Sequence, residues 1–198
     1  MGTGPRRTMR DPPRDPRRVA ILISGRGSNM RALVERASGY EVALVASNKP
    51  DADGLDWARA QGLETWVLES KGVDKEEFDR TMSAELKKHG VGTIALAGFM
   101  RILSPWFVDQ WRGRILNIHP SLLPKYRGLD THARAIASGD TVSGCSVHVV
   151  TEELDAGEIL GKVEVPIQPR DTPDALERRV LEAEHELYPR VLSEFVSR

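Results

Sequence analysis

An asparagine and a histidine stand two residues apart at the end of an apolar run in GRILNIHPSLL, the segment from Gly113 to Leu123. Residues i and i+2 of a strand project from the same face, so Asn117 and His119 can point together at one substrate atom. Histidine is the usual proton donor or acceptor near neutral pH, and an asparagine amide can hydrogen-bond an oxygen on which negative charge develops. The pair predicts an active site suited to acyl transfer.

The chain offers no obvious nucleophile beside this pair. The absence of a serine or cysteine in an elbow motif favours direct attack by a substrate amine over a covalent acyl-enzyme. A third group should orient the imidazole or raise its pKa, and in the acidic loop Glu152–Gly157 the best placed candidate is Asp155. A single Asp in a turn, or a single His, is more often structural, so the prediction depends on the three residues together.

A glycine-rich turn follows the first apolar run and precedes a segment of helical period. Glycines let the backbone N–H groups approach an anion closely, and a helix N-terminus adds a favourable dipole, so the turn predicts a phosphate site. Its spacing fits neither the dinucleotide pattern nor the loop of nucleotide triphosphatases, so the ligand need not be a nucleotide cofactor. A plain strand-to-helix turn is the alternative. The turn consists of Ser24, Gly25, Arg26, Gly27, Ser28 and Asn29.

Short apolar runs alternate with segments of helical period from Arg18 onward, the pattern of a parallel sheet covered by helices. We therefore predict an α/β fold, with a Rossmann-like, mostly parallel sheet flanked by helices. The predicted parallel strands are Val19–Ile23, Val42–Ser47, Thr65–Leu68, Thr93–Ala97 and Ile115–His119. The predicted helices between them are Asn29–Ala37, Asp53–Gln61, Asp74–His89 and Ser104–Trp111.

The pattern changes after His119, where we expect an antiparallel part of the sheet. Ser143–Val149 and Ile159–Val165 flank a loop and read as an antiparallel pair. A final helix opens at Thr172-Pro173, and Pro189 is expected to kink or locally break it. Its apolar stripe consists of Leu176, Val180, Ala183, Leu187 and Val191.

Bulk properties limit the possible functions. A chain of 198 residues suits one domain, predicted over residues 18–198, after a disordered tail rich in proline and arginine over residues 1–17. A net charge of −1 gives no reason to expect a nucleic-acid partner, and no apolar stretch is long enough for a membrane span. The single cysteine, Cys145, cannot form an intrachain disulfide and reads as a strand residue. We expect a soluble, cytoplasmic protein.

Several segments resemble the phosphoribosylglycinamide formyltransferases, folate-dependent enzymes that formylate glycinamide ribonucleotide in purine synthesis. The strings that carry the resemblance are LISGRGSN, LAGFMRILSPWFV, RILNIHPSLLPKYRG, SGCSVHVVTEELDAGEIL and AEHELYP. The resemblance implies that the formyl group passes from 10-formyltetrahydrofolate, as co-substrate, to the substrate amine through a tetrahedral intermediate. It implies that Asn117 and His119 stabilise the oxyanion and that Asp155 supports a protonated His119.

The resemblance also assigns binding residues. It implies that the partners are small molecules only, that no metal ion is needed, and that the protein is a monomer or a homodimer. His148 lies near the folate pocket by analogy, with a structural role as the alternative, and His132 and His185 receive no role. Ribonucleotide binding is expected from Gly25, Arg26, Gly27, Ser28, Asn29, Pro120 and Glu184. Folate binding is expected from Met100, Arg101, Ile102, Leu103, Asn117, His148, Glu153, Leu154 and Asp155.

Asp130 departs from the family pattern. Members commonly read K-[YF]-P-G-x-H-T-H after the proline, whereas this chain reads KYRGLDTH from Lys125 to His132. We predict that Asp130 mainly caps the helix that begins near Thr131, since Asp suits an N-cap. The alternative is that its charge raises the pKa of Asp155.

Related activities fit this sequence less well. Methionyl-tRNA formyltransferases share the Asn, His and Asp but add a tRNA-contacting domain, and formyltetrahydrofolate hydrolases usually add a regulatory domain. Neither domain is expected within these 198 residues. The phosphate turn and AEHELYP favour the ribonucleotide over a sugar nucleotide. A catalytically silent phosphate- or folate-binding module is the alternative from another class.

Overall fold

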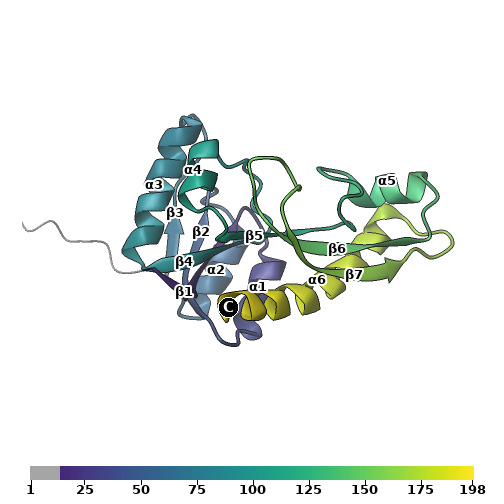
Figure 1. Cartoon of the computed structure of the whole chain (residues 1–198), viewed down its shortest axis with the longest axis horizontal. Coiled ribbons are helices and arrows are strands. Elements are labelled where there is room, and N and C mark those ends of the chain that lie inside the picture. Colours follow the sequence, from purple (N-terminus) through teal and green to yellow (C-terminus); the bar gives the residue numbers. More distant parts are fainter. Residues whose placement is uncertain (1–13) are drawn as a thin grey trace, which may run out of the picture.

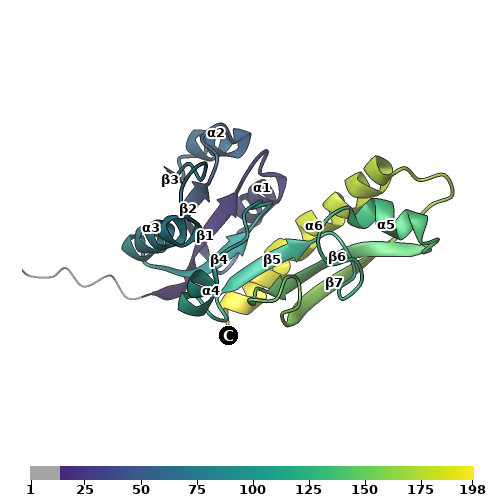
Figure 2. The same cartoon turned by 90° about the horizontal axis from the view of Figure 1, so that it is seen from above.

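The computed structural model describes residues 14–198, in which seven strands form one sheet in the order β3-β2-β1-β4-β5-β6-β7 (Figures 1 and 2). Strands β1 to β5 are parallel, whereas β6 pairs antiparallel with both β5 and β7. This is the predicted mixed sheet. The strands are β1 Asp15–Ile23, β2 Glu41–Ser47, β3 Thr65–Val67, β4 Val91–Leu96, β5 Ile115–His119, β6 Val142–Val149 and β7 Ile159–Pro166.

Helices cover both faces of the sheet, which explains why the central strands are apolar on both sides. Buried side chains of α1, α2 and α6 pack on one face, and those of α3 and α4 pack on the other. Every residue of Val19–Ile23 is fully buried between these layers. The helices are α1 Ser28–Glu35, α2 Asp53–Ala60, α3 Lys75–Lys88, α4 Pro105–Gln110, α5 Thr131–Ala137 and α6 Pro173–Val196.

The first strand begins earlier than its apolar residues indicate. Asp15 pairs with Val91 of β4, and the hydroxyl of Thr93 donates to the carbonyl oxygen of Pro16 at 2.7 Å. The residues just before Val19 thus belong to the sheet and not to the predicted tail, because backbone pairing needs no apolar side chain. The rest of that tail, residues 1–13, lies outside the described residues.

The last helix runs without a break through Pro189, so the predicted local break is wrong. Buried residues lie on both sides of the proline, and their packing on the sheet holds the helix together. The Tyr188 hydroxyl lies 3.1 Å from the carbonyl oxygen of Leu96 and 3.0 Å from that of Leu116. This contact joins α6 to the last residue of β4 and to the second residue of β5.

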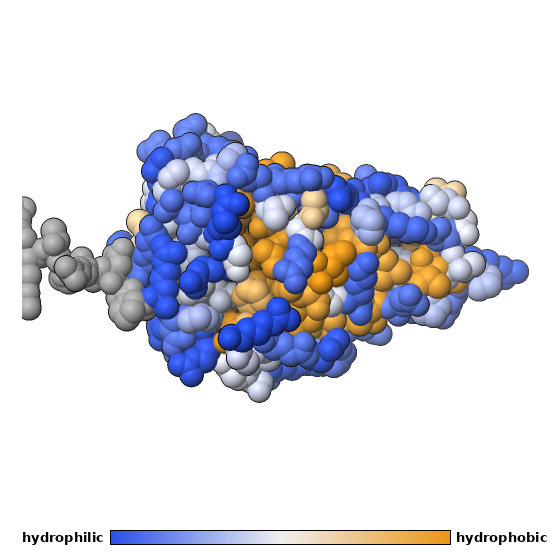
Figure 3. All heavy atoms as spheres, in the orientation of Figure 1, coloured by the Kyte–Doolittle hydropathy of each residue, from blue (hydrophilic) through white to orange (hydrophobic). Residues whose placement is uncertain are grey.

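Apolar surface gathers over the half of the molecule that holds β6, β7 and α6, while the half around α3 is hydrophilic (Figure 3). Strand β7 is the last strand in the sheet order, so its apolar side chains are covered less than those of the central strands. Ile159 is accordingly exposed, and Val163 is only half-buried. Across residues 14–198, no helix combines the length and apolarity that crossing a membrane requires.

Candidate active site

Strand β5 places Asn117 and His119 on one face of the sheet, at its carboxyl end. On the neighbouring strand β6, His148 is the pairing partner of Asn117 and Ser146 is the partner of His119. Paired residues of adjacent strands project to the same side, so the three polar side chains Asn117, His119 and His148 share this face. His119 and His148 are buried, and Asn117 is half-buried.

Asp155 lies between the two histidines. Its Oδ2 is 3.4 Å from Nδ1 of His119, and its Oδ1 is 3.5 Å from Nε2 of His148. The backbone N–H of Gly128 donates to Oδ2 at 3.0 Å. The side chain of Asp155 is 7% exposed, so this carboxylate is shielded from water while facing two groups that can carry positive charge.

Burial disfavours the charged carboxylate of Asp155, but its surroundings outweigh that cost. Hydrogen bonds from His148 and Gly128, together with the charges of both histidines, hold the pKa of Asp155 below its ordinary value. Asp130 is exposed and is not among the groups that shift this pKa, which is lowered and not raised, so the alternative that Asp130 raises the pKa of Asp155 is wrong.

Both ring nitrogens of His119 face acceptors. Nδ1 faces the Asp155 carboxylate at 3.4 Å, and Nε2 lies 2.9 Å from the carbonyl oxygen of Tyr126. A neutral imidazole has one N–H, whereas the imidazolium has two, so only the charged ring donates in both directions. The geometry therefore suits a protonated His119.

His148 connects Asp155 to Asn117. Its Nδ1 lies 3.1 Å from the carbonyl oxygen of Val149, which indicates a proton on that nitrogen. Its Nε2 lies 3.3 Å from Nδ2 of Asn117, so a neutral ring accepts a hydrogen bond from the asparagine amide. The same Nε2 lies 3.5 Å from Oδ1 of Asp155, so His148 stands between the asparagine amide and the carboxylate.

The turn after His119 is fixed to β6 by hydroxyl groups. Pro120 follows His119 directly and is half-buried in this turn. The Ser146 hydroxyl donates to the carbonyl oxygen of Ser121 at 2.7 Å and accepts from the backbone N–H of Leu123 at 3.0 Å. Tyr126, whose carbonyl meets His119, has a φ of 54° and so lies in the left-handed region. Fixed backbone therefore presents the Tyr126 carbonyl to the histidine.

Asp130 occupies the N-cap position of α5, but within residues 14–198 its side chain makes no capping hydrogen bond. Its φ of 58° is left-handed, whereas a capping residue normally has extended backbone that aims its side chain at the first helical N–H groups. Only its carbonyl oxygen takes part, accepting from Arg134 N at 3.0 Å. The predicted capping role is therefore wrong.

The glycine-rich turn is closely packed against α2. Gly27 has a φ of 71°, and a Cβ there would lie 2.7 Å from Cε of Met30 and 3.2 Å from Cα of Gly54. The backbone N–H of Gly54 donates to the carbonyl oxygen of Gly25 at 3.1 Å. The first turn of α1 contains no acidic residue, so its N–H groups suit an anion. Arg26 is exposed and Ser28 is half-buried beside them.

Asn29 and Glu184, far apart in sequence, meet at this turn. Nδ2 of Asn29 donates to Oε2 of Glu184 at 2.7 Å, and Glu184 is 6% exposed. Burial raises the pKa of Glu184 to about 7, although the hydrogen bond from Asn29 opposes the shift. Oδ1 of Asn29 is buried and lacks a partner among the described residues. Two of the predicted ribonucleotide residues are thus in direct contact.

The predicted folate segment after β4 exposes apolar side chains. Met100 is 71% exposed and Ile102 is 70% exposed, whereas Leu103 is buried. The guanidinium of Arg101 instead lies over the ring of Phe78 on α3, with its Cζ 4.5 Å from the ring centroid. The side chain of Arg101 therefore packs against α3, unlike the exposed side chains beside it.

The loop with Asp155 is the other predicted folate segment. Glu153 is exposed and pairs with Arg127 at 2.6 Å, and Leu154 is 57% exposed. A groove of about 520 Å³ runs between this loop and α4. The residues that line it are Val108, Arg112, Gly113, Val149, Val150, Thr151, Glu152, Glu153 and Glu158.

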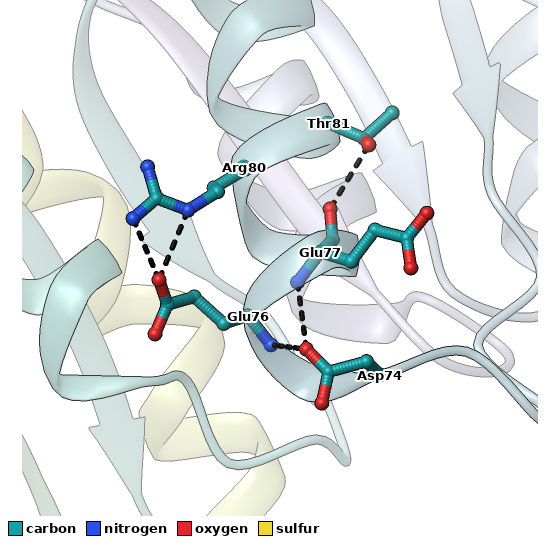
Figure 4. Close-up of a pocket in the computed structure, with 5 residues that line it drawn as sticks. All are labelled: Asp74, Glu76, Glu77, Arg80 and Thr81. Carbon is teal, nitrogen blue, oxygen red and sulfur yellow. Dashed lines mark hydrogen bonds and ion pairs between the residues drawn. The ribbon is translucent and has the colours of Figure 1, made fainter.

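Other candidate groups do not join the site. Burial raises the pKa of Cys145 to about 12, which makes it a poor nucleophile. Burial lowers the pKa of both His132 and His185, which keeps these rings neutral. A hollow of about 480 Å³ lies at the start of α3 (Figure 4). The Asp74 carboxylate in its lining caps the helix by accepting from the N–H groups of Glu76 and Glu77, so this carboxylate has a structural role.

Sequence reasoning missed two contributors. Tyr126 contacts His119 through its backbone carbonyl, which no residue type signals. Ser24 is the first residue of the predicted turn, where no role was assigned to it, and its hydroxyl accepts from the N–H of Met100 at 2.8 Å. A polar residue at the carboxyl end of a buried strand was the available signal for Ser24.

The sequence matches the formyl transferase family over residues 17–192. It is 45% identical over 182 residues to the phosphoribosylglycinamide formyltransferase of Escherichia coli (strain K12), covering 89% of this chain and 86% of that one. It is 44% identical over 180 residues to the trifunctional purine biosynthetic protein adenosine-3 of Homo sapiens, covering 88% of this chain and 18% of that longer protein.

A solved structure gives the same relationship. The phosphoribosylglycinamide formyltransferase of Brucella melitensis matches with a TM-score of 0.87 at 46% identity, covering 92% of this chain and 96% of that one. The fold and sequence thus agree over nearly the whole described chain. This chain belongs to the formyl transferase family.

Proposed function

We propose that this chain transfers the formyl group of 10-formyltetrahydrofolate to the amine of glycinamide ribonucleotide, a step of de novo purine biosynthesis. The observation that carries the proposal is the buried Asp155 carboxylate shared by His119 and His148, with Asn117 beside them. The names of the relatives in Escherichia coli and Brucella melitensis support the choice of acceptor.

The first step is attack by the amine. Its lone pair forms a C–N bond to the formyl carbon, and the C=O π electrons move onto the formyl oxygen, giving a tetrahedral intermediate. The Asn117 amide and the Nε2–H of His119 stabilise the negative oxygen. In the structure, Nε2 of His119 lies 2.9 Å from the carbonyl oxygen of Tyr126. The formyl oxygen therefore replaces this carbonyl oxygen as the acceptor of the Nε2–H when substrate binds.

The second step is collapse of the intermediate. The bond between the formyl carbon and N10 of the folate breaks, its electron pair stays on N10, and N10 takes up a proton while the attacking nitrogen loses one. The ionised Asp155 keeps His119 charged throughout and helps to move the proton through water. The scheme uses no metal ion and no covalent enzyme intermediate.

Two groups of residues hold the substrates. The ribonucleotide phosphate binds the N–H groups of the glycine-rich turn, and Glu184 accepts hydrogen bonds from the ribonucleotide, as does the free Oδ1 of Asn29. The exposed side chains of Met100 and Ile102 cover the pterin ring of the folate, opposite the backbone around Glu153 to Asp155. Pro120 completes the ribonucleotide side, and Arg101 and Leu103 support the folate side.

The test is a substrate-dependence assay with the purified full chain. Tetrahydrofolate should form from 10-formyltetrahydrofolate only when glycinamide ribonucleotide is added, in a one-to-one ratio with the formylated ribonucleotide. His119→Ala is the inactive control, and Ser197→Ala, at the C-terminal end of α6, is the matched variant that should retain activity.

Three results would contradict the proposal. Folate release without the amine would identify a hydrolase, binding of both compounds without turnover would identify a silent module, and transfer only to a sugar nucleotide or to methionyl-tRNA would identify a different acceptor.

A further inference from the structure

Ser24 ties together the ends of three strands. It follows the last residue of β1, and its backbone N–H donates to the carbonyl oxygen of Gly98, which follows β4, at 3.1 Å. Its hydroxyl accepts from the N–H of Met100 at 2.8 Å and donates to Oδ1 of Asn48, which follows β2, at 2.5 Å. Ser24 is 6% exposed, so these bonds are shielded from water.

The orientation of the Asn48 amide is fixed by a further contact. Nδ2 of Asn48 donates to the hydroxyl of Ser70 at 3.1 Å, which directs Oδ1 toward Ser24. The Ser24 hydroxyl has one proton, and Asn48 accepts it, so its lone pair is left for the N–H of Met100. Each group in this short chain of hydrogen bonds therefore determines the direction of the next.

The network spans the point where the sheet divides. β1 lies between β2 and β4 in the strand order, and the chain leaves β1 toward α1 on one face but leaves β4 toward α4 on the other. Open α/β sheets bind ligands in the crevice outside the carboxyl ends of such strands. Ser24, the first residue of the glycine-rich turn, bridges this crevice to the segment from Gly98 to Leu103.

That segment is anchored at its other end as well. The backbone N–H of Ser104 donates to Oδ2 of Asp79, which is fully buried, at 2.6 Å. Between the two anchors, Met100 and Ile102 expose most of their apolar side chains. A backbone held at both ends thus presents these side chains, and the bond between Met100 and Ser24 is one of its two attachments.

We propose that Ser24 is a positioning residue that couples the two substrate sites, so that ribonucleotide bound at the glycine-rich turn strengthens folate binding at Met100–Leu103. The inference rests on the proposed function. An anion drawn to the N–H groups after Ser24 fixes the start of the turn, and the hydroxyl bond transmits that ordering to Met100. The coupling is reciprocal, because linkage between two binding equilibria has one value.

The experiment measures the dissociation constant of tetrahydrofolate with and without saturating glycinamide ribonucleotide, using the full chain. Neither compound carries a formyl group, so no transfer occurs during the measurement. In the wild type we expect the ribonucleotide to lower this constant by about fivefold or more. In Ser24→Ala, which loses both hydroxyl bonds, we expect a factor within about twofold of 1.

Ser83→Ala is the matched control. Ser83 is a buried serine whose hydroxyl accepts from Nε1 of Trp111 at 3.0 Å, within the packing of α3 and not at the crevice. It loses a comparable buried hydroxyl bond but should keep the wild-type coupling factor. If Ser24→Ala does not fold, Asn48→Ala replaces it, because removing the Asn48 amide frees the Ser24 hydroxyl to rotate.

The outcomes separate the inference from the proposed function. Binding of both compounds to the wild type with a factor of 1, or an unchanged factor in the folded Ser24 or Asn48 variant, overturns the coupling alone. Loss of the coupling in Ser83→Ala would also overturn the inference, because the effect would then follow from removing any buried hydroxyl and would not be specific to Ser24. Failure of the wild type to bind either compound overturns the proposed function.

Discussion

Asp155 is a carboxylate whose ionised form has partners on both sides. His119 and His148 contact different oxygens of the same group, so losing the negative charge removes two interactions together. We predict that Asp155→Asn lowers kcat by about 10²- to 10⁴-fold, the range for proton-transfer groups, while KM for the ribonucleotide changes little. Steady-state kinetics at neutral pH check this. If kcat/KM fell by the same factor but only because KM rose, Asp155 would be a binding residue.

The lowered pKa of Asp155 also predicts a pH dependence of stability. The folded state holds the carboxylate ionised more strongly than the unfolded state, so this contribution is present above the unfolded pKa of about 3.9 and is lost as pH falls through the folded value. The difference in unfolding free energy between wild type and Asp155→Asn should therefore shrink between about pH 5 and pH 2. Denaturant titrations at each pH measure it, and a constant difference would contradict the shift.

Glu184 presents the opposite case. Burial raises its pKa to about 7, so between about pH 4.5 and pH 7 the folded chain binds more protons than the unfolded chain. The unfolding free energy should fall as pH rises through this window, by up to about 3 kcal/mol relative to Glu184→Gln. Urea titrations of both proteins across this window test the slope. Parallel curves for the two proteins would show that Glu184 titrates normally.

At the scale of the element, the turn between β1 and α1 depends on Gly27. Alanine there is strained by the positive φ and also crowds Gly54, whereas Gly62 has a φ of 74° but nothing within 4 Å of its Cβ position in the described structure. Gly62→Ala is therefore the matched control, with an expected cost of about 1–2 kcal/mol from backbone strain alone. Gly27→Ala should cost more.

The same pair of variants separates stability from binding. We expect Gly27→Ala to raise KM for the ribonucleotide about tenfold, as a loss of roughly 1.4 kcal/mol in binding would do, and Gly62→Ala to leave it unchanged. Thermal unfolding and substrate saturation curves give both quantities. If Gly27→Ala raised only the KM for the folate, the turn would bind the folate and not the ribonucleotide.

The elements were predictable where side chains repeat with a clear period. The apolar run Ile115–His119 and the alternation of strands and helices predicted β5 and the mixed sheet, because burial on both faces leaves a continuous apolar signature. The start of β1 at Asp15 was not predictable, since Asp15 joins through its backbone. Pro189 indicated a break that tertiary packing overrides.

The candidate site shows the same division. The grouping of Asn117, His119 and Asp155 at one end of the sheet could be predicted from their residue types and spacing, whereas their catalytic roles stay predictions. The place of Asp130 was not, because its left-handed backbone, and not its residue type, turns the carboxylate away from the helix N-terminus. The Tyr126 carbonyl and the second histidine contact of Asp155 depend on how distant loops fold onto the sheet.

At the scale of the whole molecule, α6 unites the parallel and antiparallel parts of the sheet. It contacts α1 and β5 as well as α5, β6 and β7, and in Figures 1 and 2 it extends alongside the antiparallel strands toward the far end of the molecule. Glu184 lies one turn before Tyr188 on the same helix, so the ribonucleotide residue and the strand contact share one rigid support. We therefore expect the described chain to unfold as one cooperative unit.

The hydroxyl of Tyr188 tests this unity. It is fully buried against the carbonyl oxygens of Leu96 and Leu116, so Tyr188→Phe leaves two buried acceptors without that donor and should cost about 1–3 kcal/mol in unfolding free energy. Tyr40→Phe is the control, because the Tyr40 hydroxyl donates only to the nearby carbonyl oxygen of Leu33 and is half-buried, so its loss should cost less. Calorimetry should show a single transition at a lower Tm in Tyr188→Phe. Two separate transitions would mean that the two parts of the sheet fold independently and that α6 does not join them.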